Sequence, residues 1–318
     1  MMNTVQNFEL YAPKLIEKRE FFSSGHRACQ GCGEVLGLRM IMKALGEDVV
    51  VSNATGCMEI ISTAYPHTAW ETPYIHVAFE NAAAAVGSGV EAGLKALRRK
   101  GKIADRDVKS VAIAGDGGTV DIGLQSLSGA MERGHDMVFF CLDNEAYMNT
   151  GIQRSSATPF MAATTTSPAG KAIKGQRTGK KNVAEIMVAH NLAYVATACP
   201  SYPLDLMEKV KKAKAVKGPA YVHVYTVCPT GWRAASEQTI KLGRLVVETG
   251  IFPLYEVENG KYRLTMETPE PRRPVEDYLK LQGRFRHLDP SDVAKVQALV
   301  DKEYRKLMHK VKTSVPWS

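Results

Sequence analysis

The stretch that decides the fold is residues 111–151, VAIAGDGGTVDIGLQSLSGAMERGHDMVFFCLDNEAYMNTG. It begins with a short apolar run, Val111–Ala114, and a second run, Met137–Leu142, stands near its end. Both runs suit buried strands. Apolar residues with helical spacing lie between them: Leu124, Leu127 and Met131. Gly134 then marks the expected end of this helix. The stretch therefore predicts one βαβ unit with parallel strands.

A carboxylate flanked by glycines, Gly115-Asp116-Gly117-Gly118, follows the first predicted strand, and Asn144 follows the second. Residues at the carboxyl ends of neighbouring parallel strands meet at one edge of a sheet, where ligands bind. Asp116 and Asn144 would offer a magnesium ion a carboxylate and an amide oxygen, and the glycine amides could approach a diphosphate. We therefore predict a magnesium diphosphate site.

Two other interpretations of this glycine-rich turn compete. An ordinary turn would explain a bare Gly-Asp-Gly. The dinucleotide-binding fingerprint is disfavoured because Val120 occupies its third glycine position, and because Asp116 would face a pyrophosphate without a metal. The pairing with Asn144 at the second strand end favours the metal site.

Strand and helix patterns alternate along most of the chain, which predicts an α/β fold with a mostly parallel, doubly wound sheet. Asn81 is expected to cap a helix that continues to Leu97 and is rich in Ala and Gly, leaving room for a close neighbour. Residues 149–181 lack periodicity and predict a long loop beside the site. The other expected strands and helices are Val49–Ser52, Ile75–Phe79, Val183–His190, Tyr194–Thr197, Leu204–Lys217, Ala220–Val227 and Ser236–Glu248, with a further helix starting just after Cys32.

The pattern changes after residue 250. Asn259-Gly260 interrupts an alternating pattern and predicts a hairpin. Three prolines mark a linker, and Ser291 begins a last amphipathic helix. We expect residues 1–250 to form the cofactor-binding domain and residues 251–318 to form an extension that packs on it or on a partner.

The composition is that of an ordinary globular protein, with 45% hydrophobic and 23% charged residues. The net charge of +8 comes partly from lysine-rich stretches, including Lys209, Lys211, Lys212, Lys214 and Lys217, and we interpret most of these lysines as parts of solvated helix faces. No nucleic-acid-binding module is recognisable, so no nucleic-acid partner is expected. The charged lead Met1–Phe22 does not suit a signal peptide, and no apolar run is long enough to cross a membrane. We expect a cytoplasmic protein without a membrane partner.

Six cysteines in such a chain are not expected to form disulfides, and the Cys-x-x-Cys spacing indicates metal or redox chemistry. Cys141 and Cys199 are interpreted as small core residues. The other four lie at turns or strand ends and form a candidate four-thiolate site: Cys29, Cys32, Cys57 and Cys228. Their spacing alone does not separate zinc from an iron–sulfur cluster.

Several short motifs occur in a fixed order. Cys-x-Gly-Cys-Gly-Glu begins at Cys29, Thr-Gly-Cys ends at Cys57, and Gly-Asp-Gly precedes Asp121-Ile122-Gly123. The run Asp143–Gly151 follows. Together these motifs resemble the β subunit of pyruvate:ferredoxin oxidoreductase, a thiamine diphosphate-binding 2-oxoacid oxidoreductase. The similarity extends from about Gly25 to Trp232.

The resemblance implies three cofactors: thiamine diphosphate, Mg²⁺ and one [4Fe–4S] cluster. Asp116, the Asn144 side chain and the Ala146 carbonyl would bind magnesium, and the four cysteines named above would hold the cluster. Glu34 and Asn149 match positions beside the cofactor and are the candidate catalytic residues. Fused-chain relatives have threonine where this chain has Asn144, but either residue offers an oxygen. The implied cofactor contacts are Glu34, Cys57, Gly115, Asp116, Gly117, Gly118, Asn144, Ala146 and Asn149.

The implied reaction is oxidative decarboxylation of a 2-oxo acid with coenzyme A and ferredoxin. Pyruvate is the expected substrate, and oxalate or another 2-oxo acid is the alternative. An α subunit would complete the cofactor site, while γ and ferredoxin-like δ subunits would carry electrons onward, so the chain alone should be inactive. A non-redox thiamine enzyme would need no cluster, and a zinc-stabilised interaction module would leave Asp116 and Asn144 without a role.

Overall fold

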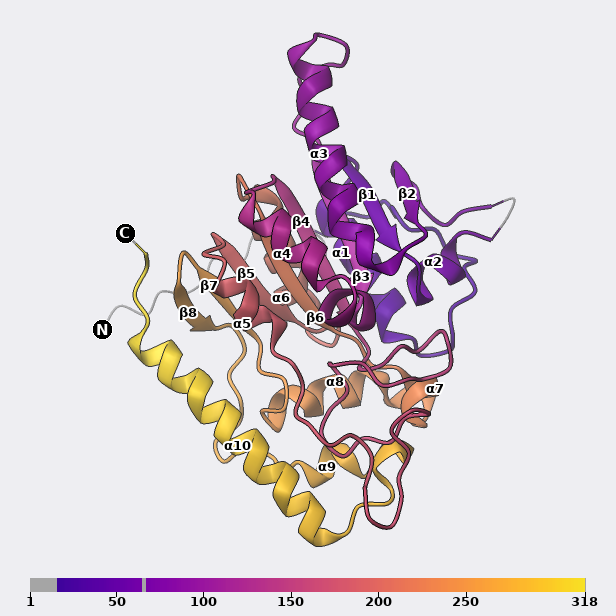
Figure 1. Cartoon of the computed structure of the whole chain (residues 1–318), viewed down its shortest axis with the longest axis vertical. Coiled ribbons are helices and arrows are strands. Elements are labelled where there is room, and N and C mark those ends of the chain that lie inside the picture. Colours follow the sequence, from indigo (N-terminus) through magenta and orange to yellow (C-terminus); the bar gives the residue numbers. More distant parts are fainter. Residues whose placement is uncertain (1–15, 65–66, 318) are drawn as a thin grey trace.

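The computed structural model describes residues 16–64 and 67–317. Its eight strands form one sheet in the order β2-β1-β3-β4-β6-β5-β7-β8 (Figure 1). The first six strands in this order are parallel. Strand β7 runs antiparallel to both of its neighbours, β5 and β8. The strands are β1 (Val49–Ala54), β2 (Tyr74–Val77), β3 (Lys109–Gly115), β4 (Met137–Asp143), β5 (Tyr194–Ala198), β6 (Ala220–Tyr225), β7 (Tyr255–Glu258) and β8 (Lys261–Leu264). The mostly parallel α/β sheet predicted from the sequence is confirmed.

Helices join the strands and cover both faces of the sheet. The α-helices are α1 (Gly33–Leu45), α2 (Cys57–Ser62), α3 (Ala83–Arg99), α4 (Leu124–Glu132), α5 (Val183–Val188), α6 (Pro203–Ala215), α7 (Pro229–Trp232), α8 (Thr239–Glu248), α9 (Glu276–Leu279) and α10 (Pro290–Thr313). Short 3-10 turns are η2 (Glu80–Ala82), η4 (Ser236–Gln238) and η5 (Gly283–Phe285), and η3 (Gly117–Asp121) is a π-helical turn. The predicted βαβ unit thus corresponds to β3, α4 and β4.

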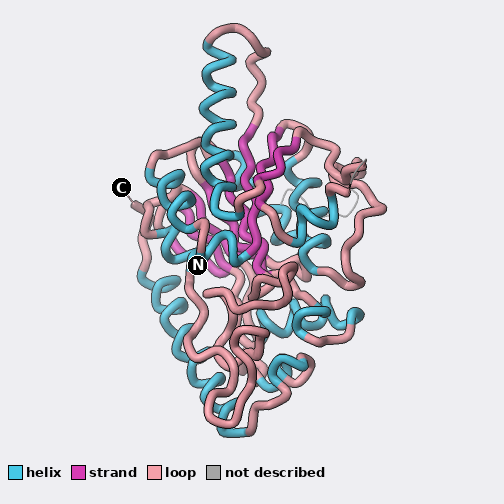
Figure 2. Tube along the Cα trace, turned by 45° about the vertical axis from the view of Figure 1, so that its right-hand side comes forward, coloured by secondary structure: helices cyan, strands magenta, loops and turns pink. Residues whose placement is uncertain are grey.

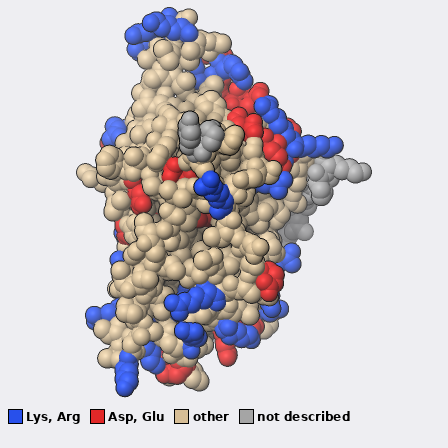
Figure 3. Space-filling view, turned by 90° about the vertical axis from the view of Figure 1, so that its right-hand side faces the viewer, with Lys and Arg blue, Asp and Glu red and all other residues tan. Residues whose placement is uncertain are grey.

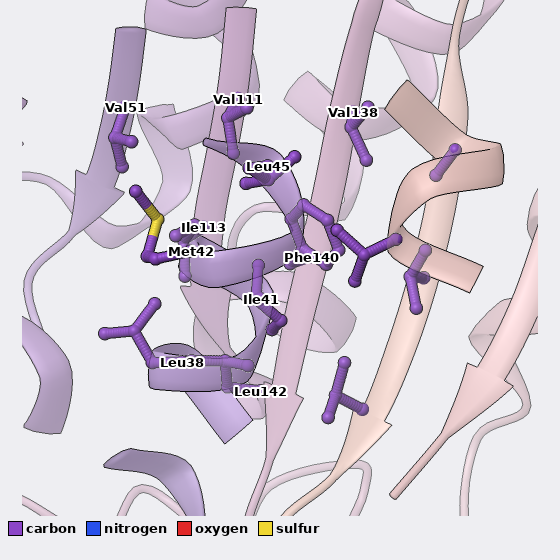
Figure 4. Close-up of a cluster of buried hydrophobic side chains, with 14 of the residues drawn as sticks. Leu38, Ile41, Met42, Leu45, Val51, Val111, Ile113, Val138, Phe140 and Leu142 are labelled. Carbon is purple, nitrogen blue, oxygen red and sulfur yellow. The ribbon is translucent and has the colours of Figure 1, made fainter. Parts of the chain in front are cut away.

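Alternate residues of the central strands face two separate cores. Val111 and Ile113 pack under α1 and α6, together with Phe140 of β4 (Figure 4). Ala112 and Phe139 face the opposite side, where α3, α4 and α5 cover the sheet. Because both faces are buried, these strands are apolar throughout rather than alternating in polarity.

The C-terminal residues are joined to the main sheet. The predicted hairpin at Asn259-Gly260 is confirmed as β7 and β8, and β7 pairs with β5. Helix α10 begins at a capping box on Asp289 and runs along one side of the molecule (Figure 1). The boundary between the cofactor-binding domain and the extension, placed after residue 250, stays a prediction.

One expectation from the sequence was wrong, and one lysine is an exception to another. Asn81 does not cap α3, because η2 precedes that helix and its N-cap is Ala82. Lys209 does not lie on a solvated face, because its ammonium is buried against Asp205 at 2.7 Å and donates to the Thr197 carbonyl. A lysine on a helix that packs against a sheet can be buried when it meets such partners.

Helix α3 projects beyond the sheet at its C-terminal end (Figure 2). Lysine and arginine side chains gather at this tip (Figure 3), where Arg99, Lys100 and Lys102 are exposed. Of the glycines in α3, Gly87 packs on the sheet, while Gly89 and Gly93 have open space around them. Within the described ranges, no helix combines the length and apolar character needed to cross a membrane. Residues 1–15 of the charged N-terminal lead lie outside the described ranges.

Candidate functional site

The two residues predicted to bind magnesium lie at the carboxyl ends of neighbouring strands. Asp116 follows β3 and Asn144 follows β4, and Gly115 at the end of β3 is in register with Leu142. Both side chains are almost fully buried. The fold therefore brings together these two side chains, which the sequence separates by a helix and a strand.

Asn144 is held with one side-chain atom free. Its amide nitrogen donates to a carboxylate oxygen of Glu34 at 3.0 Å, and its backbone carbonyl accepts from the Trp232 indole at 2.9 Å. The side-chain oxygen of Asn144 is buried and has no hydrogen-bond partner among the described residues. A buried acceptor without a partner is costly, so this oxygen suits a ligand that the chain itself does not provide.

The Asp116 carboxyl group is buried among other acids. Ser155, from the long loop, donates to it at 2.5 Å. Burial raises the pKa of Asp116 well above its ordinary value, and the nearby Asp143 and Glu34 carboxylates raise it further. A divalent cation would reverse this effect by stabilising the charged carboxylate. Asp116 and the free oxygen of Asn144 therefore fit a magnesium ion.

The glycines of the motif allow a close approach of another residue. A side chain at position 117 would collide with the Tyr147 ring, since a Cβ there would lie 2.2 Å from a ring carbon. The Tyr147 hydroxyl donates to the Gly117 carbonyl at 3.1 Å. Gly117 is therefore required by packing within the chain.

The remaining predicted cofactor contacts differ in exposure. Ala146 is buried directly after the Asn144 turn, which we define as Asp143, Asn144 and Glu145. Asn149 is exposed, in the turn that ends where Gln153 bridges to Tyr147. Its placement beside the reactive end of a cofactor stays a prediction.

Two buried acids of the Asn144 turn are each paired with basic side chains from distant segments. Asp143 contacts Lys180 at 2.5 Å and His223 at 2.7 Å. Glu145 contacts Lys180 at 3.0 Å and Arg284 at 2.5 Å. Burial alone would raise the pKa of Asp143, but Lys180 and His223 outweigh it and lower that pKa to about 2. Asp116 has no ion pair among the described residues, and the more distant charge of Lys180 only partly offsets the rise in its pKa.

Glu34 links the candidate magnesium ligand to the cysteines. It accepts hydrogen bonds from Asn144 and from the Cys57 thiol. Burial raises the pKa of Glu34 to about 7, and the Asp143 charge contributes in the same direction, while the two hydrogen bonds oppose it. A single buried carboxyl group therefore contacts both predicted metal sites.

The four predicted cluster ligands come from three separate parts of the chain and converge near Glu34. The Gly33 amide donates to the Val227 carbonyl at 2.9 Å, which places the Cys-x-x-Cys segment beside Cys228. Burial raises the pKa of the Cys57 thiol, with further contributions from Glu34 and then from the other three cysteines: Cys228, Cys32 and Cys29. Burial likewise raises the pKa of Cys32 to about 12 and that of Cys228 to about 11. Such thiols need a cation to become thiolates.

Zinc and an iron–sulfur cluster differ in the spacing of thiolates that they require. In the described part of the chain, no three His, Cys, Asp or Glu residues are grouped as ligands of one metal ion. Four thiolates on one zinc ion must crowd around a single centre. A [4Fe–4S] cluster takes one thiolate on each of its irons, so its ligands stand farther apart. Whether the four cysteines hold a cluster or a zinc ion stays a prediction. All six cysteines are free, and Cys141 and Cys199 are buried core residues as predicted.

Several residues around the site had no predicted role. Ser155 and Lys180 belong to the loop that was expected beside the site, and the absence of periodicity gave no means of choosing them. Arg284 lies in the C-terminal extension, where its position next to Glu145 had no signal in the sequence. Trp232 lies at the end of the region that resembles the family, but its contact with Asn144 was not expected.

Comparisons with known proteins identify the family. Residues 54–224 match the family of the thiamine pyrophosphate enzyme, C-terminal TPP binding domain. The chain is 56% identical to pyruvate synthase subunit PorB of Methanocaldococcus jannaschii, over 91% of this chain and 97% of that one. It is 47% identical to ketoisovalerate oxidoreductase subunit VorB of Pyrococcus horikoshii, over 93% of this chain and 96% of that one.

A solved structure shares the fold. It is a 2-oxoglutarate:ferredoxin oxidoreductase from Magnetococcus marinus, described with 2-oxoglutarate, coenzyme A and succinyl-CoA bound. The match has a TM-score of 0.54 at 21% identity and covers 77% of this chain and 84% of that one. The fold, the family match and the high identity over nearly whole chains lead to one conclusion: this chain belongs to the thiamine pyrophosphate enzymes, as a member of the family of pyruvate synthase and related 2-oxoacid:ferredoxin oxidoreductase β subunits.

Proposed function

We propose that this chain binds thiamine diphosphate through Mg²⁺ and holds one [4Fe–4S] cluster, as the β subunit of a cytoplasmic 2-oxoacid:ferredoxin oxidoreductase. The proposed reaction converts pyruvate, coenzyme A and oxidised ferredoxin into acetyl-CoA, carbon dioxide and reduced ferredoxin. The observation that carries the proposal is the buried, unpartnered side-chain oxygen of Asn144 at the strand end next to Asp116.

The chain's own residues would divide the work of holding the cofactor. Asp116, Asn144 and the Ala146 carbonyl would bind the metal, with Gly115, Gly117 and Gly118 beside the diphosphate. Glu34 orients the Asn144 amide so that its oxygen stays available. Asn149, on an exposed turn, would reach the reactive end of the cofactor. Bound thiamine diphosphate would supply the bond-breaking chemistry.

A cluster held by the four cysteines would accept electrons close to the metal site. Cys29, Cys32, Cys57 and Cys228 would hold the cluster, and Cys57 would also border the cofactor. The Cys57 thiol already contacts Glu34, which contacts Asn144. This contact chain supports a cluster placed beside the cofactor.

The relatives bear on the substrate and on the partners. Those named pyruvate synthase subunit reach 57% identity, which favours pyruvate. The ketoisovalerate oxidoreductase relatives, at 47%, favour a branched 2-oxo acid as the second candidate. Because the relatives are named as subunits, we propose that an α subunit completes the cofactor pocket, and that γ and ferredoxin-like δ subunits complete the electron path. The open face of α3 at Gly89 and Gly93 is our candidate for a close contact with one of them.

The test is cofactor binding by single-site variants of the complex. Asp116→Ala should abolish magnesium-dependent thiamine diphosphate binding in isothermal titration calorimetry, because it removes the only charged ligand proposed for the metal. Asn144→Ala should weaken binding less, since water can replace a neutral ligand. Asp105→Ala, at the exposed tip after α3, is the matched control and should bind like the wild type. Undiminished affinity in Asp116→Ala would refute the assignment.

A further inference from the structure

We propose that Arg284, in the C-terminal extension, is a positioning residue for Asn144: it fixes the turn that presents the Asn144 oxygen to the metal. The inference rests on the proposed function, since it concerns how one proposed metal ligand is held. Arg284 lies 140 positions from Asn144 in the sequence, yet it contacts the residues on which the geometry of that turn depends.

Arg284 is buried and makes directed contacts on several sides. Its Nη2 donates to Glu145 at 2.5 Å and to the Tyr278 hydroxyl at 3.2 Å. Its Nε donates to the Gln282 side chain at 2.9 Å. The guanidinium also stacks on the Trp232 ring, 4.0 Å from the ring centroid. A planar fork held on several sides has little freedom to move.

Two of these partners determine the position of Asn144. Trp232 donates its indole hydrogen to the Asn144 carbonyl at 2.9 Å. Glu145, the next residue along the chain, adopts a left-handed backbone conformation with φ of 69°, which is unusual for a residue other than glycine. Its amide donates to the Asp143 side chain at 2.9 Å. Arg284 therefore holds the Asn144 turn from both sides, through a stacked ring and an ion pair.

The ion pair between Arg284 and Glu145 also balances buried charge. Asp143 and Glu145 are both buried, and Lys180 is shared between them. If Arg284 were removed, one ammonium group would have to serve two buried carboxylates, with only His223 to assist it at Asp143. A buried carboxylate that has lost its partner turns toward water, and this movement would disturb the turn.

Arg284→Met tests the inference in the complex as it is purified. We expect magnesium affinity, titrated calorimetrically at saturating thiamine diphosphate, to fall about tenfold or more, as is usual when a residue that orients a metal ligand is lost. The double variant Glu145→Gln/Arg284→Met removes both charges and should recover part of that loss. Loss of packing alone would not be rescued by a second substitution.

Controls separate the possible outcomes. Arg286→Met, an exposed arginine two positions away, should bind magnesium like the wild type. If Arg284→Met does not fold by circular dichroism, Arg284→Lys serves instead, because it keeps the charge but loses the fork and should give an intermediate affinity. Magnesium affinity within twofold of wild type in the folded Arg284 variant would overturn this inference, as would the absence of rescue in the double variant. The proposed function is tested separately, because it fails if Asp116→Ala binds thiamine diphosphate as tightly as the wild type does.

Discussion

Glu34→Gln should change how the stability of the metal-free chain depends on pH. Glu34 is buried, and burial raises its pKa to about 7 from an ordinary value of 4.5. A carboxyl group with a raised pKa stabilises the fold while it is protonated in the folded state. That stability is fully present below about pH 4.5 and is lost as the pH rises through about 7.

The size of the effect follows from the same two values. The difference between an ordinary pKa of 4.5 and one of about 7 corresponds to about 3 kcal/mol of unfolding free energy, most of it lost between about pH 5 and 8. Glutamine keeps the shape of the side chain and an oxygen that accepts from Asn144 and from the Cys57 thiol, but it does not titrate. The variant should therefore lose less stability than the wild type over this range, and it should be the more stable protein at pH 8.

The assay is urea unfolding at several pH values, with a chelator to remove metals and a reductant to keep the thiols free. The free energy of unfolding is extrapolated to zero urea at each pH. Glu132→Gln, an exposed glutamate on α4, is the control and should follow the wild-type profile. A Glu34→Gln profile parallel to that of the wild type would show that Glu34 does not titrate in this range, and would refute the reasoning.

Two further predictions concern the cluster and the glycine motif. Cys228→Ala should lose or degrade the proposed cluster in an iron and acid-labile sulfide assay on anaerobically purified protein. Cys141→Ala should keep the cluster, because Cys141 is buried in the core of the sheet. An unchanged iron content in Cys228→Ala would point to a different fourth ligand. Gly117→Ala should lower the unfolding free energy by about 1–3 kcal/mol, because its methyl group would overlap the Tyr147 ring. Gly89→Ala, in the open face of α3, should instead raise it by up to about 1 kcal/mol, and equal effects of the two changes in thermal unfolding would contradict the packing argument.

The sequence predicted the parts of the fold that depend on local patterns. Apolar runs located β3 and β4, and the Asn-Gly pair located the turn between β7 and β8. The start of α3 was misplaced because a 3-10 turn occupies the position where Asn81 was expected to act as the cap. Propensity favours asparagine at such a position, but η2 packs against η3, and Asn81 instead offers its backbone carbonyl to Ser126.

The site was predictable where a motif names the residue and unpredictable where only tertiary packing does. Asp116 and Asn144 follow consecutive parallel strands, so their meeting at one sheet edge follows from the topology. The contacts of Ser155 and Lys180 depend on the path of a long loop that has no periodicity. Lys209 could not be identified as the buried exception, because a lysine-rich stretch does not reveal which of its members faces the sheet.

The charge arrangement explains why the C-terminal extension belongs to the site. Residues 1–250 contain four buried acids at the sheet edge: Glu34, Asp116, Asp143 and Glu145. Among the described residues of that range, Lys180 is the only lysine or arginine that contacts any of these acids. Arg284 supplies the second cation from outside it. Asp143 and Glu145 thus have basic partners. Asp116 and Glu34 instead have raised pKa values, and they lie beside the free oxygen of Asn144. In the proposed function, a divalent cation would satisfy both the charge and the open acceptor, and Arg284, by pairing with Glu145, would leave Asp116 as the acid available to it.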